Sequence, residues 1–122
     1  MKVLALCHAG VVRSGAMVRA LKEEGIDAIA AGVGHNGKEA LNTLMNWADR
    51  IVVMDEKLLP QIPRHQLKKT TLADVGGDVW GYADHPDLKN RVFVMVEEWK
   101  KSGWKFRPLR LKPTGPVERL EA

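Results

Sequence analysis

Residues 3–21 read VLALCHAGVVRSGAMVRAL, and this stretch decides the fold that we predict. Lys2 to Leu6 has the length and the apolar character of a buried strand. Ser14 to Glu24 repeats apolar residues at helical spacing, and Gly25 follows its end. A buried strand that leads through a short loop into a helix predicts the first unit of a parallel α/β sheet.

The following segments continue the alternation of strands and helices. Asn36, with Glu39 three residues later, resembles a capping box, and apolar residues at helical spacing predict a helix up to Ala48. A short, weak helix is expected from Asp55 to Ile62, because prolines interrupt that segment. The further predicted strands are Asp27–Ala31, Arg50–Met54 and Thr70–Val75.

The last helix has the clearest pattern. Pro86 and Asp87 suit its first turn, and Gly103 ends it. A helix packed on one face of the sheet is therefore expected here. Its predicted buried stripe consists of Leu88, Val92, Met95, Val96 and Trp99.

Length and composition indicate one ordinary globular domain, with 122 residues, 45% of them hydrophobic and 28% charged. No apolar run approaches the ~20 residues of a membrane helix, and Met1 leads directly into the first predicted strand rather than into a secretory signal. The single cysteine, Cys7, excludes an internal disulfide, which favours the cytoplasm. The four histidines have no zinc-ligand spacing, so we predict no metal and no cofactor.

The C-terminal part of the chain differs in charge from the rest. Trp104 to Ala122 holds five basic residues against two acidic ones, within a chain of net charge +4. We predict a core domain at residues 1–103 and a basic, proline-containing extension at 104–122. A solvated extension is favoured over a contact with nucleic acid or with an acidic partner.

The loop after the first strand has the composition of an anion-binding site. Its backbone N–H groups and the N-terminus of the following helix attract an oxyanion. Arg13 offers a planar fork for two phosphate oxygens, and its charge favours the thiolate of Cys7, which is the nucleophilic form. Ser14 is placed to donate a hydrogen bond to that thiolate. The remaining candidate substrate-binding residues of the loop are His8, Ala9, Gly10, Val11 and Val12.

A plainer interpretation of Cys7 is that it is a small core residue at the end of a buried strand. The C-x5-R spacing alone is a loose pattern. The preceding strand, the following helix, Ser14 and the internal Gly10 together favour the anion-binding loop.

The loop and three later stretches resemble the low-molecular-weight protein tyrosine phosphatases, from about Met1 to Trp99. The segment CHAGVVRS resembles the family's C-x5-R-S signature after the first strand. Ala31-Gly32 resembles its S-A-G stretch, and residues 47–54, WADRIVVM, resemble its A-D-x-I-x-x-M strand. Residues 78–81, DVWG, resemble its acid loop. The resemblance implies a three-layer α/β sandwich whose four parallel strands follow the order 2-1-3-4, flanked by helices.

A carboxylic acid is needed to protonate the leaving group, and Asp78 is our candidate. Asp78 follows the fourth predicted strand, at the same sheet edge as Cys7, and the family's acid loop has its aspartate and aromatic residue in this order. Asp84 is the alternative, although Asp84-His85-Pro86 also suits a helix cap. Trp80 is a candidate wall against an aromatic substrate ring, with loop packing as the equal alternative.

The sequence departs from the family pattern at five positions. In the loop, Ala9 replaces a glycine, Gly10 replaces an asparagine and Val12 replaces a second cysteine, so the disulfide found in many members is impossible. Gly15 and Val79 stand where prolines are common. The nucleophile and the arginine remain, so these departures bear on loop rigidity and hence on rate.

The leading interpretation is a cytoplasmic phosphatase that acts on a phosphotyrosine protein or a small aryl phosphate through a cysteinyl phosphate. One alternative is a phosphocarrier that resembles the IIB subunits of sugar phosphotransferase systems, although such a carrier needs neither Arg13 nor a downstream acid. An arsenate reductase of the same fold is disfavoured because the chain has no further cysteines. A catalytically weak anion-binding module is the last alternative. We expect no membrane partner and no nucleic acid, and the oligomeric state stays open.

Overall fold

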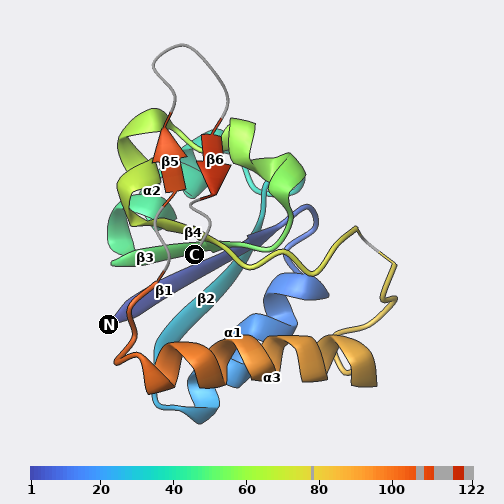
Figure 1. Cartoon of the computed structure of the whole chain (residues 1–122). Helices are drawn as coiled ribbons and strands as arrows, with labels where there is room; N and C mark the ends of the chain where they lie inside the picture. The colour runs from blue at the N-terminus through green and yellow to red at the C-terminus, as the bar shows by residue number, and fades with distance from the viewer. Residues whose placement is uncertain (78, 107–108, 112–116, 120–122) are drawn as a thin grey trace.

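A computed structural model of the chain describes residues 1–77, 79–106, 109–111 and 117–119. Strand β1 (Lys2–Cys7) lies in the middle of a four-stranded parallel sheet (Figure 1). It pairs with β2 (Asp27–Gly32) on one side and with β3 (Arg50–Val53) on the other, and β4 (Thr70–Leu72) follows β3. The strand order is therefore β2-β1-β3-β4, which confirms the predicted fold class.

Helices cover both faces of this sheet (Figure 1). Along β1, Val3 and Cys7 join one core cluster and Leu4 and Leu6 join the other, because successive side chains of a strand point to opposite faces. The first cluster is covered by α1 (Arg13–Glu23) and α3 (Pro86–Lys101). The second is covered by α2 (Lys38–Trp47) and two 3-10 helices, η1 (Glu56–Gln61) and η2 (Arg64–Lys69).

Several local predictions need correction. The capping box at Asn36 was wrong: the N-cap of α2 is Gly37, without a side-chain cap, and the Asn36 side chain accepts from Gly32 instead. Strand β4 is shorter than predicted and ends at Leu72, although Ala73 N–H still donates to Val53 O at 2.8 Å. Helix η2 was not predicted, because it has no long apolar repeat.

The last helix agrees with the expected stripe. Leu88, Val92, Val96 and Trp99 are buried, and Met95 is partly buried against the same cluster. Its cap is His85, whose Nδ1 accepts from Asp87 N–H at 3.2 Å. The aspartate that precedes His85 therefore does not cap the helix.

The division of the chain after residue 103 stays a prediction. Phe106 is buried, and its ring centroid lies 4.8 Å from that of Trp99, so the core reaches at least this residue. Beyond it, β5 (Leu109–Leu111) and β6 (Val117–Arg119) pair antiparallel, and β5 contacts β4.

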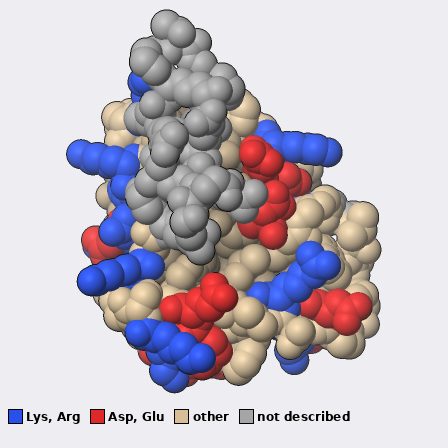
Figure 2. Space-filling model, in the orientation of Figure 1, with Lys and Arg blue, Asp and Glu red and all other residues tan. Residues whose placement is uncertain are grey.

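The described surface has a mixed charge. In the view of Figure 2, acidic and basic side chains alternate over the part of the chain that is described. None of the helices in the described ranges is long and apolar enough to cross a membrane.

Candidate active site

Cys7 is the last residue of β1 and lies at the carboxyl edge of the sheet. It is buried, and its Sγ lies 3.1 Å from Ser14 Oγ. Gly10 N–H donates to the same sulfur at 3.2 Å. A backbone donor, a hydroxyl and the N-terminus of α1 thus surround the sulfur, which is the kind of environment in which a nucleophilic cysteine is found.

The loop around Cys7 packs directly on the end of β2. Val33 N–H donates to Cys7 O at 3.0 Å, and Gly34 N–H donates to His8 O at 2.8 Å. Gly10 has a φ of +78°, and a Cβ on it would lie 2.5 Å from Gly32 N. Only glycine combines this backbone angle with this close approach.

Asn36 holds the surface on which the loop rests. Its Oδ1 accepts from Gly32 N–H at 2.8 Å, and a Cβ on Gly32 would in turn collide with the backbone of Ala9. Gly10 replaces an asparagine of the family pattern that the loop resembles, and here Asn36, after β2, supports the loop from outside. Sequence reasoning missed this role, because a polar residue before a helix was interpreted as a cap.

We expect Gly10→Ala to destabilise the protein more than Gly25→Ala does. Both glycines have a φ of +78°, but nothing lies within 4 Å of a Cβ on Gly25. The control should cost roughly 1–2 kcal/mol of unfolding free energy for the left-handed backbone, and Gly10→Ala should cost about 1–3 kcal/mol more for the collision. Urea unfolding of both variants measures the difference. Equal losses would mean that the contact with Gly32 does not constrain the loop.

Arg13 begins α1 and is buried, with 2% of its surface exposed. Its Nη1 donates to Asp55 Oδ2 at 2.9 Å and to Gly76 O at 3.0 Å. Its Nε is buried and has no partner among the described residues. Nε is thus left without a protein partner in that part of the chain, and Nε together with Nη2 forms the edge of a guanidinium that can hold two oxygens of a phosphate.

Asp55 is a site residue that sequence reasoning missed. It follows β3, and its Oδ1 also accepts from Lys57 N–H at 3.0 Å, which caps η1. The carboxylate therefore orients the guanidinium of Arg13 from a fixed position. Its place directly after a buried strand, at the same edge as Cys7, was the signal that could have identified it.

The segment that follows β4 reaches the site through Gly76. Asp74 Oδ1 accepts from Gly76 N–H at 2.8 Å, and the carbonyl oxygen of Gly76 accepts from Arg13. Asp78, the candidate acid, lies outside the described residues. Gly76, two residues earlier in the chain, contacts Arg13. The role of Asp78 as the acid stays a prediction.

Trp80 packs between the core and α3. Its ring lies 5.2 Å from that of His85 in an edge-to-face arrangement, and the guanidinium of Arg91 lies 5.4 Å from the ring centroid. Its Nε1 is buried without a partner in the described ranges. These contacts account for Trp80 by packing, and its part in substrate binding stays a prediction. Asp84, the alternative acid, forms an exposed ion pair with Arg19.

The outer side of the loop carries the other predicted binding residues. His8 and Val11 are exposed, whereas Ala9 and Val12 are partly buried. The His8 ring lies 6.5 Å from that of His35. Within the described residues, no group of three or more His, Cys, Asp or Glu side chains is arranged to hold a metal ion.

Several solved structures that match this fold are phosphatases. The tyrosine phosphatase Wzb from Escherichia coli K30 superposes with a TM-score of 0.63, at 18% identity, over 83% of this chain and 96% of that one. The Erwinia amylovora tyrosine phosphatase AmsI gives a TM-score of 0.62, at 18% identity, over 83% and 91%. The YwlE arginine phosphatase from Geobacillus stearothermophilus gives 0.55, at 16% identity, over 83% and 94%.

The chain has the fold of the low-molecular-weight protein tyrosine phosphatases. At the level of sequence, no family model and no curated protein matches it. Fold alone does not settle activity, so the function rests on the site.

Proposed function

We propose that this protein is a cytoplasmic phosphatase that hydrolyses phosphate monoesters through a cysteinyl phosphate on Cys7. The observation that carries the proposal is a buried cysteine and a buried arginine at the two ends of one loop. The Cys7 sulfur accepts from Gly10 N–H and contacts Ser14 Oγ, and the buried Nε of Arg13 has no partner among the described residues. In this proposal, a phosphate dianion held by the Nε side of the guanidinium is attacked by the Cys7 thiolate.

The proposed reaction has two steps. The Cys7 thiolate attacks phosphorus, so that a P–S bond forms while the ester P–O bond breaks, and the leaving oxygen takes a proton from Asp78. Water then attacks the same phosphorus and gives a proton to the Asp78 carboxylate. The P–S bond breaks, and inorganic phosphate and the thiolate are released. Arg13 holds the phosphoryl oxygens throughout, and the hydroxyl of Ser14 stabilises the thiolate as it leaves.

Aryl phosphates are the preferred substrate class in this proposal, either as phosphotyrosine in a protein or as a small molecule. Val11, Val79 and Tyr82 are 64%, 80% and 57% exposed. Val11 belongs to the loop, and the other two follow Gly76, which is bonded to Arg13. An exposed apolar side chain in the loop, together with exposed Val79 and Tyr82 in the segment after Gly76, supports a flat aromatic leaving group.

A pair of matched aspartate variants tests the acid assignment. We expect Asp78→Asn to lower kcat on para-nitrophenyl phosphate, in metal-free buffer at mildly acidic pH, by about a hundredfold or more. Asp84→Asn, which breaks only an exposed ion pair with Arg19, should change kcat by less than about twofold. The reverse order of effects would assign the acid to Asp84.

Turnover by the wild-type protein tests the function as a whole. Hydrolysis of para-nitrophenyl phosphate and of a phosphotyrosine peptide supports it. Since a solved structure of this fold is an arginine phosphatase, a phosphoarginine peptide belongs in the same assay. Binding of vanadate without turnover of any substrate would instead favour the phosphocarrier or the weak anion-binding module.

A further inference from the structure

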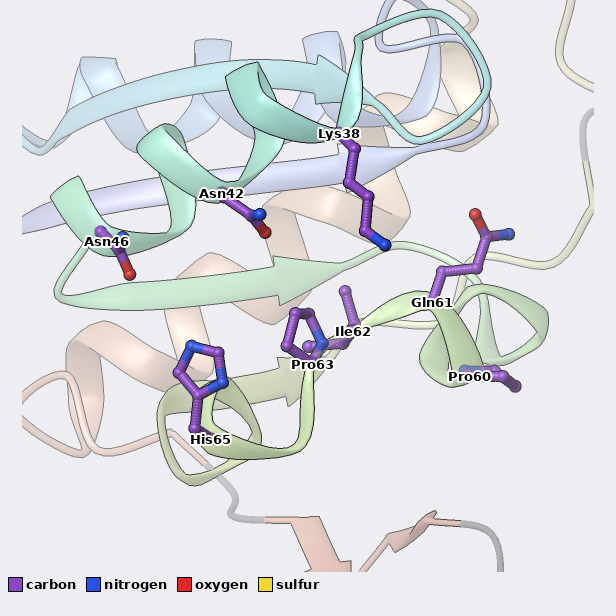
Figure 3. A pocket seen from close by; sticks show the side chains of 8 residues that line it. All are labelled: Lys38, Asn42, Asn46, Pro60, Gln61, Ile62, Pro63 and His65. Carbon is purple, nitrogen blue, oxygen red and sulfur yellow. The ribbon is translucent and has the colours of Figure 1, made fainter.

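A groove with a mixed polar and apolar lining lies on the face of the sheet that α2, η1 and η2 cover (Figure 3). Its volume is about 540 Å³. One wall is the side of α2 that carries Lys38, Asn42 and Asn46, which recur every four residues. The other wall comes from the end of η1, the two residues that follow it and η2, and it consists of Pro60, Gln61, Ile62, Pro63 and His65. No carboxylate lines it.

One end of the groove lies toward the carboxyl edge of the sheet, which is the edge that carries Cys7. Figure 3 shows Lys38 and Gln61 at the end toward which the strand arrows point, and Asn46 and His65 at the other. On the α2 wall, Gly34 is bonded to His8, and Lys38 follows four residues later. On the opposite wall, η1 starts directly after Asp55, which holds Arg13. Both walls thus continue from segments that support the loop around Cys7.

The polar groups of the groove are mainly donors. Gln66 is buried, and its Nε2 donates to Asn46 Oδ1 at 2.7 Å, so the NH₂ group of Asn46 is the part left for a ligand. Lys38 has only donors, and within the described residues the side chains of Lys38 and Asn42 have no hydrogen-bond partner. Such a lining favours a ligand rich in acceptors and negative charge.

The walls are held together before any ligand arrives. Lys69, in η2, donates to the carbonyl oxygen of Ala48 at 2.7 Å and to that of Met45, both at the end of α2. Loss of water around this ammonium group lowers the pKa of Lys69. The bond between Gln66 and Asn46 adds a second link. The groove is therefore preformed, which reduces the entropy lost on binding.

The length of the groove suits a stretch of polypeptide. Lys38 and Asn46 lie eight positions apart in the helix, which is about 12 Å at the helical rise. An extended peptide covers that distance with about four residues. A free phosphate ion would fill only a small part of it.

We propose that this groove binds an acidic peptide segment that flanks the phosphorylated residue of the substrate. The placement beside a phosphorylated residue rests on the proposed function, whereas the affinity for an acidic segment does not. Lys38 pairs with a carboxylate nearest the active site, and the amides of Asn42 and Asn46 donate to peptide carbonyl oxygens further along.

The first test measures binding without catalysis. A fluorescein-labelled peptide rich in glutamate and free of phosphate is titrated with the full-length protein, and fluorescence anisotropy gives Kd. We expect Lys38→Glu to weaken binding about tenfold, and Asn42→Ala to weaken it by less. Lys22→Glu, on exposed α1 surface over the other face of the sheet, makes the same charge change and should leave Kd unaltered. Equal Kd values for Lys38→Glu and Lys22→Glu would overturn the proposal. It would also be overturned if the wild-type protein bound a peptide with glutamine in place of each glutamate as tightly as the acidic peptide.

The second test separates the groove from the activity. Two phosphotyrosine peptides are used, one flanked by glutamates and one by glutamines. The measured quantity is kcat/KM for the glutamate peptide divided by kcat/KM for the glutamine peptide. We expect wild type and Lys22→Glu to share a ratio of about ten, and Lys38→Glu to bring it near one. A ratio of one in the wild type would show that the groove does not bind the substrate's flanking residues, while the proposed phosphatase activity would be unaffected. Binding of the acidic peptide by a protein without turnover would leave the groove and overturn the proposed function.

Discussion

Replacing Cys7 with serine is expected to reduce the hydrolysis of para-nitrophenyl phosphate by at least about a thousandfold. The sulfur lies between Gly10 N–H and Ser14 Oγ, so an alcohol at this position keeps the contacts. What it lacks is the thiolate, since a serine hydroxyl does not ionise near neutral pH. The loss should therefore appear in kcat, measured by steady-state kinetics.

Phosphate binding and thermal unfolding of Cys7→Ser provide the control for this prediction. Because Arg13 and the loop amides stay in place, phosphate should still bind to Cys7→Ser, and the midpoint of thermal unfolding should stay close to that of the wild type. Unchanged hydrolysis in Cys7→Ser would exclude a cysteinyl phosphate and would return Cys7 to the role of a core residue.

Removing the carboxylate of Asp55 is expected to damage both stability and substrate binding. Arg13 and Asp55 are 2% and 14% exposed in their side chains, so Asp55→Ala leaves a buried cation without its partner. Breaking such a pair costs about 3 kcal/mol of unfolding free energy. The loss includes the cap that Asp55 gives to Lys57 N–H. Urea unfolding of Asp55→Ala and the wild type measures this loss of unfolding free energy.

Kinetics distinguish the positioning role of Asp55 from a structural one. A guanidinium that is no longer held should bind phosphate poorly, so KM for para-nitrophenyl phosphate and the inhibition constant of phosphate should both rise in the folded variant. Asp55→Asn keeps an oxygen acceptor for Arg13, so its KM and its phosphate inhibition constant should lie between those of Asp55→Ala and the wild type. A folded Asp55→Ala protein with unchanged phosphate inhibition would show that Arg13 needs no orientation from this carboxylate.

The site was predictable where its residues are close in the chain. Cys7, Gly10, Arg13 and Ser14 lie within eight residues, so strand, loop and helix fix their arrangement locally. The cap of α3 was predicted within the stretch Asp84-His85-Pro86, and the structure assigns it to His85. Asp84 instead forms an ion pair with Arg19, 65 residues away, which no local pattern predicts.

The sequence by itself determined the alternation of strands and helices, the two faces of β1 and the loop around Cys7. These follow from periodicity and from short-range spacing, which the chain carries without any knowledge of its packing. The tertiary structure decided which groups support that loop. Asp55 and Gly76 reach Arg13 from 42 and 63 residues away, Asn36 holds Gly32 under Gly10, and η2 closes the groove against α2. Such contacts exist only once parallel strands bring their carboxyl ends to a single edge, so no local pattern announces them.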